Sequence, residues 1–125
     1  MTKTKLFQKT WIEALKSGKF RQAQGALRKD GNKKPKFCCL GLACVINNQL
    51  FPEEKVKLGK TSWGYEYDGE GYNLPPSVYD KLQLSNSGQS KLIDINDEDN
   101  CSFKKIAAEL ENNPEKYFKL NRKAK

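Results

Sequence analysis

The sequence predicts a single small α+β domain in which several short helices pack on a small antiparallel sheet. Its 125 residues are enough for one compact domain and not for two. Apolar residues recur at helical spacing in several segments, whereas aromatic residues alternate with polar ones near the middle, as in a half-buried strand. We assign the globular domain to residues 1–120 and a basic, flexible tail to residues 121–125.

The first predicted helix spans roughly residues 4–17. Phe7, Trp11 and Leu15 recur at four-residue intervals and therefore share one face of this helix. Gly18 follows the last apolar position, and glycine is the residue that most readily takes the left-handed conformation that ends a helix. The pattern therefore predicts an amphipathic helix whose apolar face packs against the core.

Glycines interrupt residues 18–29, so we expect an irregular or partly extended segment there. Residues 30–36 predict a turn followed by a polar loop. The most apolar run of the chain comes next and predicts a buried helix over residues 38–47. In this helix Gly41 permits close packing against Trp11 or another helix.

An antiparallel hairpin is predicted near residues 60–74. Asp68-Gly69 supplies a two-residue turn signal between two alternating segments. The large alternating residues of the two segments are Trp63, Tyr65, Tyr67, Tyr72 and Leu74.

The rest of the chain alternates between helices and loops. In order, we expect a helix over 76–82, a loop over 85–90, a short strand or extended lead-in over 92–97 and a helix over 103–112. Ser102 is the expected N-cap of the last of these helices, and Pro114 is expected to open a final short helical turn.

Composition excludes several classes of protein. The chain has no histidine, which excludes imidazole-based catalysis, histidine-ligated zinc and a histidine pH switch. No apolar run approaches 18 residues, so we expect no membrane span and no membrane partner. The N-terminus is basic but lacks the apolar stretch of a signal peptide. No cofactor motif is present, and we predict no cofactor.

The net charge of +8 is unevenly distributed. Residues 1–36 hold eleven Lys and Arg against two acidic residues, a net +9. Residues 37–113 hold seven basic against twelve acidic residues, a net −5, and residues 114–125 hold five against one, a net +4. Such blocks are typical of a surface that faces an anion or of a solvated arm.

Four cysteines occur without a signal peptide, which indicates reduced thiols in a cytoplasm. Cys38, Cys39, Cys44 and Cys101 lack the spacing of a zinc knuckle, and no histidine is available to activate a cysteine nucleophile. A thiol at the start of the 38–47 helix could still be activated by the helix terminus. We interpret the cysteines as small buried apolar residues.

The acidic run at residues 94–100 lacks the glycine and the final glutamate that an EF-hand loop requires at positions 6 and 12. We interpret it as a solvated turn whose carboxylates favour the N-terminus of the following helix. A carboxylate pair of Asp97 with Glu66 or Glu70 stays open at this stage, because spacing alone does not place these residues together. We predict no metal site.

Four pieces of the sequence form a recognisable pattern: Trp11-x-x-Ala14-Leu15-x-Ser17-Gly18, Phe37-Cys38-Cys39-Leu40-Gly41-Leu42-x-Cys44, Ile95-Asn96-Asp97 and Ser102-Phe103-x-x-Ile106-Ala107. In these pieces the chain resembles a family of small proteins of tailed phages and prophages. Where the family usually has an acidic residue after the third cysteine, this chain has Val45. The resemblance implies a phage accessory protein that acts in the host cytoplasm, and it brings no known activity or catalytic residues with it.

These observations favour a non-enzymatic protein that captures a small anionic ligand such as a nucleotide, for example a signal of host antiviral defence. Basic side chains would meet phosphates, glutamines would contact polar edges and aromatic rings would stack on a base. The candidate ligand-binding residues are Lys19, Arg21, Gln22, Gln24, Arg28, Lys60, Trp63, Tyr65, Tyr67, Tyr72, Asn96 and Asp97. The aromatic residues of the hairpin could instead form one face of the core.

Three alternatives stay open. The protein could bind nucleic acid through its Lys-rich ends. It could inhibit a host protein, or it could be an enzyme such as a nucleotide hydrolase, for which we find no motif and no catalytic residues. The sequence does not determine the oligomeric state.

Overall fold

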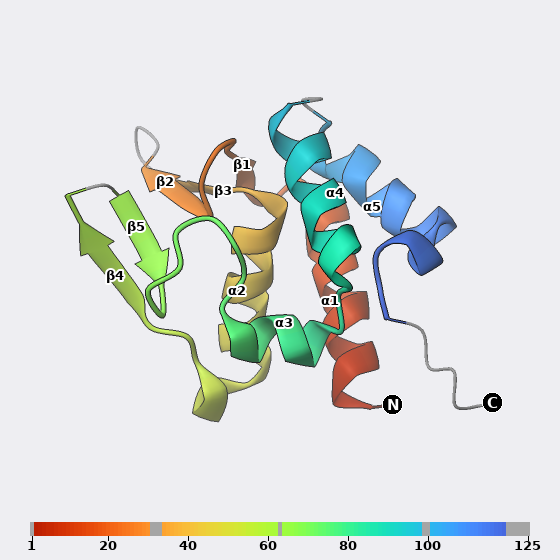
Figure 1. The fold of residues 1–125 in the computed structure, drawn as a ribbon, viewed down its shortest axis with the longest axis horizontal. Coiled ribbons are helices and arrows are strands. Elements are labelled where there is room, and N and C mark those ends of the chain that lie inside the picture. Colours follow the sequence, from red (N-terminus) through yellow and green to blue (C-terminus); the bar gives the residue numbers. More distant parts are fainter. Residues whose placement is uncertain (1, 31–33, 63, 99–100, 120–125) are drawn as a thin grey trace.

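A computed structural model describes residues 2–30, 34–62, 64–98 and 101–119. Over these residues the chain forms one small α+β domain, as predicted, with five α-helices, a three-stranded sheet and a two-stranded hairpin (Figure 1). The helices are α1 Lys3–Ser17, α2 Cys39–Leu50, α3 Pro76–Leu82, α4 Asn86–Asp97 and α5 Phe103–Asn112, with short 3₁₀ turns at Pro52–Glu54 and Pro114–Lys116. The strands are β1 Arg21–Gln22, β2 Arg28–Asp30, β3 Pro35–Phe37, β4 Leu58–Thr61 and β5 Gly64–Tyr67. The predicted tail at 121–125 lies outside the described residues.

Helix α1 begins and ends as its sequence predicts. Thr2 caps its N-terminus by accepting a hydrogen bond from the Lys5 N–H, and Gly18 ends it in the left-handed region at φ 75°. Its apolar face is buried, and the Trp11 indole donates to the Cys39 carbonyl at 2.9 Å. This bond satisfies the one polar atom of a large buried ring and fixes α1 against the start of α2.

Helix α2 occupies the middle of the domain, and Cys38 is its N-cap, with the thiol sulfur accepting from the Gly41 N–H at 3.4 Å. A Cβ atom at Gly41 would lie 1.8 Å from the Leu27 carbonyl oxygen. The prediction that Gly41 packs against Trp11 or another helix is therefore wrong. Glycine is required because the backbone just before β2 crosses the helix there.

The three-stranded sheet has the order β1-β3-β2, with β1 parallel and β2 antiparallel to β3. The partly extended segment predicted over residues 18–29 is confirmed by β1 and β2. The loop predicted over 30–36 is wrong at both ends, because Asp30 belongs to β2 and Pro35 and Lys36 belong to β3. Strands β1 and β2 pair with β3 from its two sides and keep this polar stretch extended.

The β4–β5 hairpin confirms the predicted element but not its turn. Leu58 pairs with Tyr67 and Thr61 with Gly64, so the connection lies at residues 62–63. Asp68-Gly69 does form a two-residue turn with positive φ at both positions, but it closes only the single bridge from Tyr67 to Glu70. The second long strand expected up to Leu74 does not form.

Helix α4 overturns the loop predicted over 85–90 and the strand or extended lead-in predicted over 92–97. Ser85 caps the helix by accepting from the Gly88 N–H. Its buried face consists of Gly88, Leu92 and Asn96 at four-residue spacing. A Cβ atom at Gly88 would lie 2.2 Å from the Tyr117 carbonyl oxygen, so this helix approaches the C-terminal segment too closely for any side chain there.

The remaining helices agree with the sequence. Helix α3 starts at Pro76, α5 has Ser102 as its N-cap, and a 3₁₀ turn opens at Pro114. None of the helices in the described part of the chain is both long enough and apolar enough to span a bilayer. Helix α1 packs against both α2 and α5, and the hairpin lies on the other side of α2 (Figure 1).

Candidate anion-binding site

A cleft of about 420 Å³ lies between strand β2 and the β4–β5 hairpin, which are side by side in Figure 1. This volume falls within the range of small-molecule sites, which is roughly 300–1,000 Å³. The ionisable and aromatic side chains that line it are Arg28, Lys29, Asp30, Lys60, Tyr65 and Glu66. We call this set of residues the β2–hairpin cleft.

Two cations meet on one aromatic ring in the cleft. The Arg28 guanidinium carbon lies 4.6 Å from the centre of the Tyr65 ring, and the Lys60 ammonium nitrogen lies 5.4 Å from it. Lys60 and Tyr65 are direct partners in the β4–β5 register, whereas Arg28 comes from β2. The hairpin thus carries one cation and the ring, and the sheet supplies the second cation.

The Arg28 guanidinium lies between two aromatic rings, and one of its hydrogen-bond donors has no acceptor among the described residues. Its guanidinium carbon also lies 5.9 Å from the Phe37 ring, so aromatic rings flank it from β3 and β5. Its Nε atom is buried and finds no hydrogen-bond acceptor among the described residues. An unpaired buried donor costs about 1–3 kcal/mol.

Arg28 also contacts Tyr67, the next aromatic residue of β5. Burial raises the pKa of the Tyr67 hydroxyl, and a side-chain hydrogen bond with Arg28, together with the positive charge of Arg28, opposes part of that rise. Only 3% of Tyr67 is exposed, so its ring belongs to the core. For this residue the structure agrees with the alternative that the hairpin aromatics form a face of the core, whereas Tyr65 is half-buried at the cleft.

Two carboxylates share the cleft with the cations. The Tyr65 hydroxyl donates to Asp30 Oδ2 at 3.2 Å, which fixes the ring against β2. Glu66 is half-buried and lines the cleft, and within the described ranges neither a hydrogen bond nor an ion pair engages its carboxylate. The cleft is therefore of mixed charge, and its opposite charges do not neutralise one another in pairs.

Gln22, Asn96 and Asp97 form a hydrogen-bond network behind the cleft. The buried Asn96 amide donates to the Ala23 carbonyl and to Asp97, and its oxygen accepts from Gln22 Nε2 and the Cys39 N–H. Asp97 Oδ1 also accepts from the Gly25 N–H at 3.0 Å. The network attaches α4 to the loop before β2. Gly25 also lines the cleft, so these side chains shape the wall of the site from behind.

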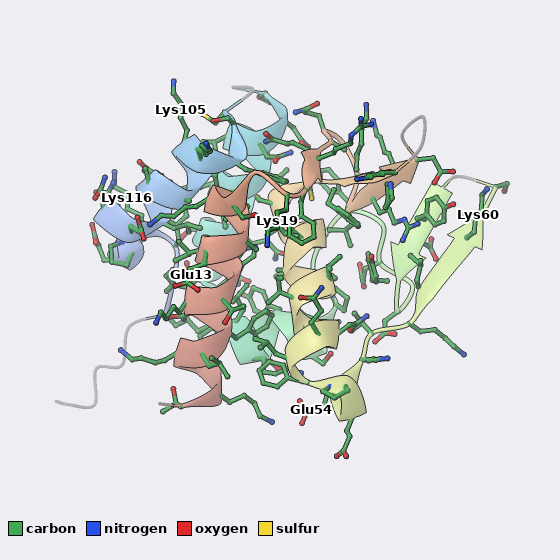
Figure 2. The ribbon with its side chains drawn as sticks, turned by 180° about the vertical axis from the view of Figure 1, so that it is seen from behind. Glu13, Lys19, Glu54, Lys60, Lys105 and Lys116 are labelled. Atoms are coloured by element: carbon green, nitrogen blue, oxygen red, sulfur yellow. The ribbon has the colours of Figure 1, made fainter. Side chains whose placement is uncertain are left out.

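The other predicted ligand-binding residues lie elsewhere. Lys19 is at the end of α1, far from Lys60 on the hairpin (Figure 2). Arg21 is on β1, which strand β3 separates from β2. Gln24 does not line the cleft. Tyr72 is 47% exposed beside the acidic end of α4, where partial burial and then the negative charge of Asp97 raise its pKa. Trp63 lies outside the described residues.

Cys38, Cys39 and Cys44 are in the core rather than in the cleft, and Cys101 is half-buried, so the interpretation of all four cysteines as buried apolar residues is wrong for Cys101. Burial raises the pKa of Cys38 to about 12 and the pKa values of Cys39 and Cys44 well above the usual range. Such thiols stay protonated at neutral pH and are poor nucleophiles and poor metal ligands. All four cysteines are free.

Sequence reasoning found the cations and the ring of the cleft but missed Lys29, Asp30 and Glu66. Asp30 was interpreted as part of a turn, and Glu66 was considered only as a partner of Asp97. Alternation along β5 gives no signal for Glu66, because a period of two sets it on the other face of the strand from Tyr65 and Tyr67. The proximity of β2 to β5 depends on tertiary packing and has no local signal.

Fold and cleft together define a small α+β protein with a mixed-charge cleft between a sheet and a hairpin. The chain belongs to the family described as a domain of unknown function, DUF8296, which it matches over residues 3–87. This match includes every residue that lines the cleft. Neither the curated proteins nor the solved structures contain a match to the chain.

Proposed function

We propose that the protein binds a small anionic, nucleotide-like ligand in the β2–hairpin cleft and does not turn it over. One observation carries the proposal: Arg28 and Lys60 converge on the Tyr65 ring without a carboxylate in ion-pair contact in the described part of the chain. Surface cations are usually solvated singly or paired with a carboxylate. These two instead lie at the same ring, and neither is in an ion pair with a described carboxylate. A phosphate between them would accept from both.

The arrangement supports binding better than catalysis. The sequence has no histidine, and the thiols of α2 and its N-cap are protonated in the core. The groups that line the cleft are cations, carboxylates, the Tyr65 ring, the Thr61 hydroxyl and backbone, and the cations are suited to hold an anion.

The biological role that we propose rests on the resemblance to small phage and prophage proteins. A small domain that holds a nucleotide without consuming it would sequester that nucleotide, and a signal of host antiviral defence in the host cytoplasm is a suitable target. The free thiols are consistent with a reducing compartment.

The test measures the thermal midpoint and calorimetric affinity of the purified protein with inorganic phosphate, pyrophosphate and a panel of mono- and cyclic nucleotides. A ligand that binds only the folded state raises the midpoint as its concentration exceeds Kd. We expect binding by wild type and a loss of at least tenfold in Lys60→Gln and Arg28→Lys, the second because a lysine lacks the planar guanidinium. Lys91→Gln, an exposed lysine of α4 outside the cleft, is the matched control.

Absence of binding to every compound contradicts the proposal. Binding of DNA or RNA with an affinity that falls steeply with salt, and with Lys60→Gln and Lys91→Gln equally affected, would favour the nucleic-acid alternative instead. Because Lys60 is exposed on the edge of the hairpin, Lys60→Gln leaves the core intact and remains informative if the Arg28 variant is unstable.

A further inference from the structure

The carboxylates of the cleft restrict the class of ligand beyond its negative charge. This inference rests on the proposed function. A site for a simple anion gains nothing from Glu66 and Asp30, because each would repel the ligand. Both residues nevertheless line the same small cavity as Arg28, Lys29 and Lys60.

The two carboxylates differ in what they can still accept. Asp30 already receives the Tyr65 hydroxyl at 3.2 Å, so it positions the ring. Glu66 has no such partner within the described ranges, although it is half-buried. An ionised carboxylate has two acceptor oxygens and no donor, so a ligand can satisfy Glu66 only with N–H or O–H groups.

The wall of the cleft beside Glu66 consists largely of backbone. A Cβ atom at Gly71 would be in van der Waals contact with the Tyr65 carbonyl oxygen at 3.5 Å and with Glu66 Cγ at 3.8 Å, so the Gly71 backbone lies close to Glu66. Gly25 and Gly64 also line the cleft, and a flat ligand can approach such a backbone wall closely.

The Tyr65 ring is less available for stacking than the sequence indicates. Arg28 and Lys60 both lie over it, at 4.6 and 5.4 Å from its centre. Selection by base stacking alone would need this ring to be open. Among the side chains that line the cleft, the carboxylate of Glu66 can accept from a hydrogen-bonding edge of a base.

We propose that the β2–hairpin cleft takes a guanine nucleotide, with the phosphate between Arg28 and Lys60 and the adjacent N1–H and 2-amino donors of the base on the Glu66 carboxylate. Guanine offers two neighbouring donors, which match the two oxygens of one carboxylate. Adenine has no N1–H and offers only its exocyclic amine to a carboxylate on that edge, and a bare phosphate offers none. The ligand therefore supplies both the negative charge that the cations lack and the donors that Glu66 lacks.

The test compares guanosine monophosphate, inosine monophosphate, adenosine monophosphate, phosphoethanolamine and inorganic phosphate by calorimetry on the full chain. Inosine monophosphate keeps N1–H but lacks the 2-amino group, so we expect it to bind about tenfold more weakly, the loss of one hydrogen bond to a charged acceptor. Phosphoethanolamine carries a phosphate and an ammonium but no base, and we expect it to bind no better than inorganic phosphate.

The variant Glu66→Gln separates recognition of the base from attraction of the phosphate. We expect it to bind guanosine monophosphate about tenfold more weakly and to lose the preference over inosine monophosphate. Inorganic phosphate should bind more tightly to the variant, because a repulsive charge is gone. Glu53→Gln, an exposed residue outside the cleft, is the matched control, and thermal midpoints verify that both variants fold.

Equal affinities for guanosine and inosine monophosphate would overturn the inference. A phosphoethanolamine affinity that equals that of guanosine monophosphate, or an unchanged preference in Glu66→Gln, would also overturn it. In each of these cases anion binding that depends on Lys60 would leave the proposed function standing. If no phosphate compound binds to wild type, the proposed function itself fails.

Discussion

Among the described residues, two aromatic rings each contact two cations, and they differ in whether a carboxylate bridges those cations. Lys3 and Lys81 lie 5.3 and 4.8 Å from the centre of the Phe51 ring, and both also donate to Glu54, at 2.9 and 2.7 Å. The other ring is that of Tyr65. Its two cations, Arg28 and Lys60, have no described carboxylate in ion-pair contact. We call the first arrangement the Phe51 cluster and the second the Tyr65 cluster.

The difference shows what a completed cation cluster looks like in this chain. In the Phe51 cluster a single carboxylate bridges both cations and connects the 3₁₀ turn at Pro52–Glu54 to α1 and α3. Phe51 also packs edge-on against Phe7, so the whole cluster stabilises the fold. In the Tyr65 cluster no described carboxylate bridges the two cations. We assign the bridging position to a ligand anion.

The largest expected effect on the free energy of unfolding concerns the contact between α2 and the backbone just before β2, the strand that carries Arg28 of the Tyr65 cluster. Gly41→Ala would drive a methyl group into the Leu27 backbone, one residue before Arg28. Since backbone cannot rotate away, we expect a loss on the order of 3 kcal/mol in the free energy of unfolding, measured by urea denaturation. Helix α2 or β2 must move, so the anion affinity should fall too.

Gly59→Ala is the matched control for this variant. Gly59 is on β4, and a Cβ atom there would have no atom within 4 Å. We expect its free energy of unfolding to change by less than about 0.5 kcal/mol. If Gly41→Ala were as stable as Gly59→Ala, the close approach of α2 to the backbone before β2 would be wrong, and with it the placement of Arg28.

A lysine-to-glutamine exchange distinguishes the two clusters directly. Lys81→Gln removes a largely buried lysine, 10% exposed in its side chain, from the Phe51 ring, and we expect it to cost about 1 kcal/mol of stability. Lys60→Gln removes a cation that lies near Arg28 without a described carboxylate, and we expect a change within about 0.5 kcal/mol.

Addition of phosphate also distinguishes the two clusters. Phosphate should raise the thermal midpoint of wild type and of Lys81→Gln but not that of Lys60→Gln. A loss of stability in Lys60→Gln equal to that in Lys81→Gln would show that Lys60 already has its counter-charge in the free protein. The distinction between the clusters would then disappear.

The sequence predicts those parts of the molecule whose packing follows a local pattern. Helix α1 is found because Phe7, Trp11 and Leu15 are apolar and share a face. Helix α4 is missed because its buried face includes Gly88, which the pattern assigns to a loop, and Asn96, which it assigns to a short strand or extended lead-in. Gly88 is there for a backbone approach to Tyr117, and Asn96 for hydrogen bonds to Ala23 and Cys39. Both sets of contacts join residues that are far apart in the sequence, so no local pattern predicts them.

The same division applies to the cleft. Arg28, Lys60 and Tyr65 are identifiable as cations and an aromatic residue, each by its type. Gln22 and Asn96 are of types that suit a ligand, yet in the structure they bond to each other and to backbone. Whether a polar side chain is available to a ligand depends on its neighbours in space, and those are set by the packing of α4 on the loop before β2.

The smallest expected effect is the acid sensitivity of the Phe51 cluster. Hydrogen bonds from Lys81 and Lys3 lower the pKa of Glu54 from 4.5 to about 2. A carboxyl whose pKa is lower in the folded state stabilises the protein above its unfolded pKa, and this contribution disappears as the pH falls towards the folded pKa. The difference in thermal midpoint between wild type and Glu54→Gln should thus be present at pH 7 and shrink between about pH 4.5 and pH 2.

Glu53→Gln, next to Glu54 but in no described ion pair, should show no such pH-dependent difference from wild type. Both residues are exposed, so charge screening by added salt should reduce the Glu54 effect at neutral pH as well. A Glu54→Gln difference that persists unchanged at pH 2 would mean that the bridge works through neutral hydrogen bonds. The Phe51 cluster would then be completed by geometry rather than by charge, and an unbridged pair of cations over Tyr65 would lose its value as a sign of a missing anion.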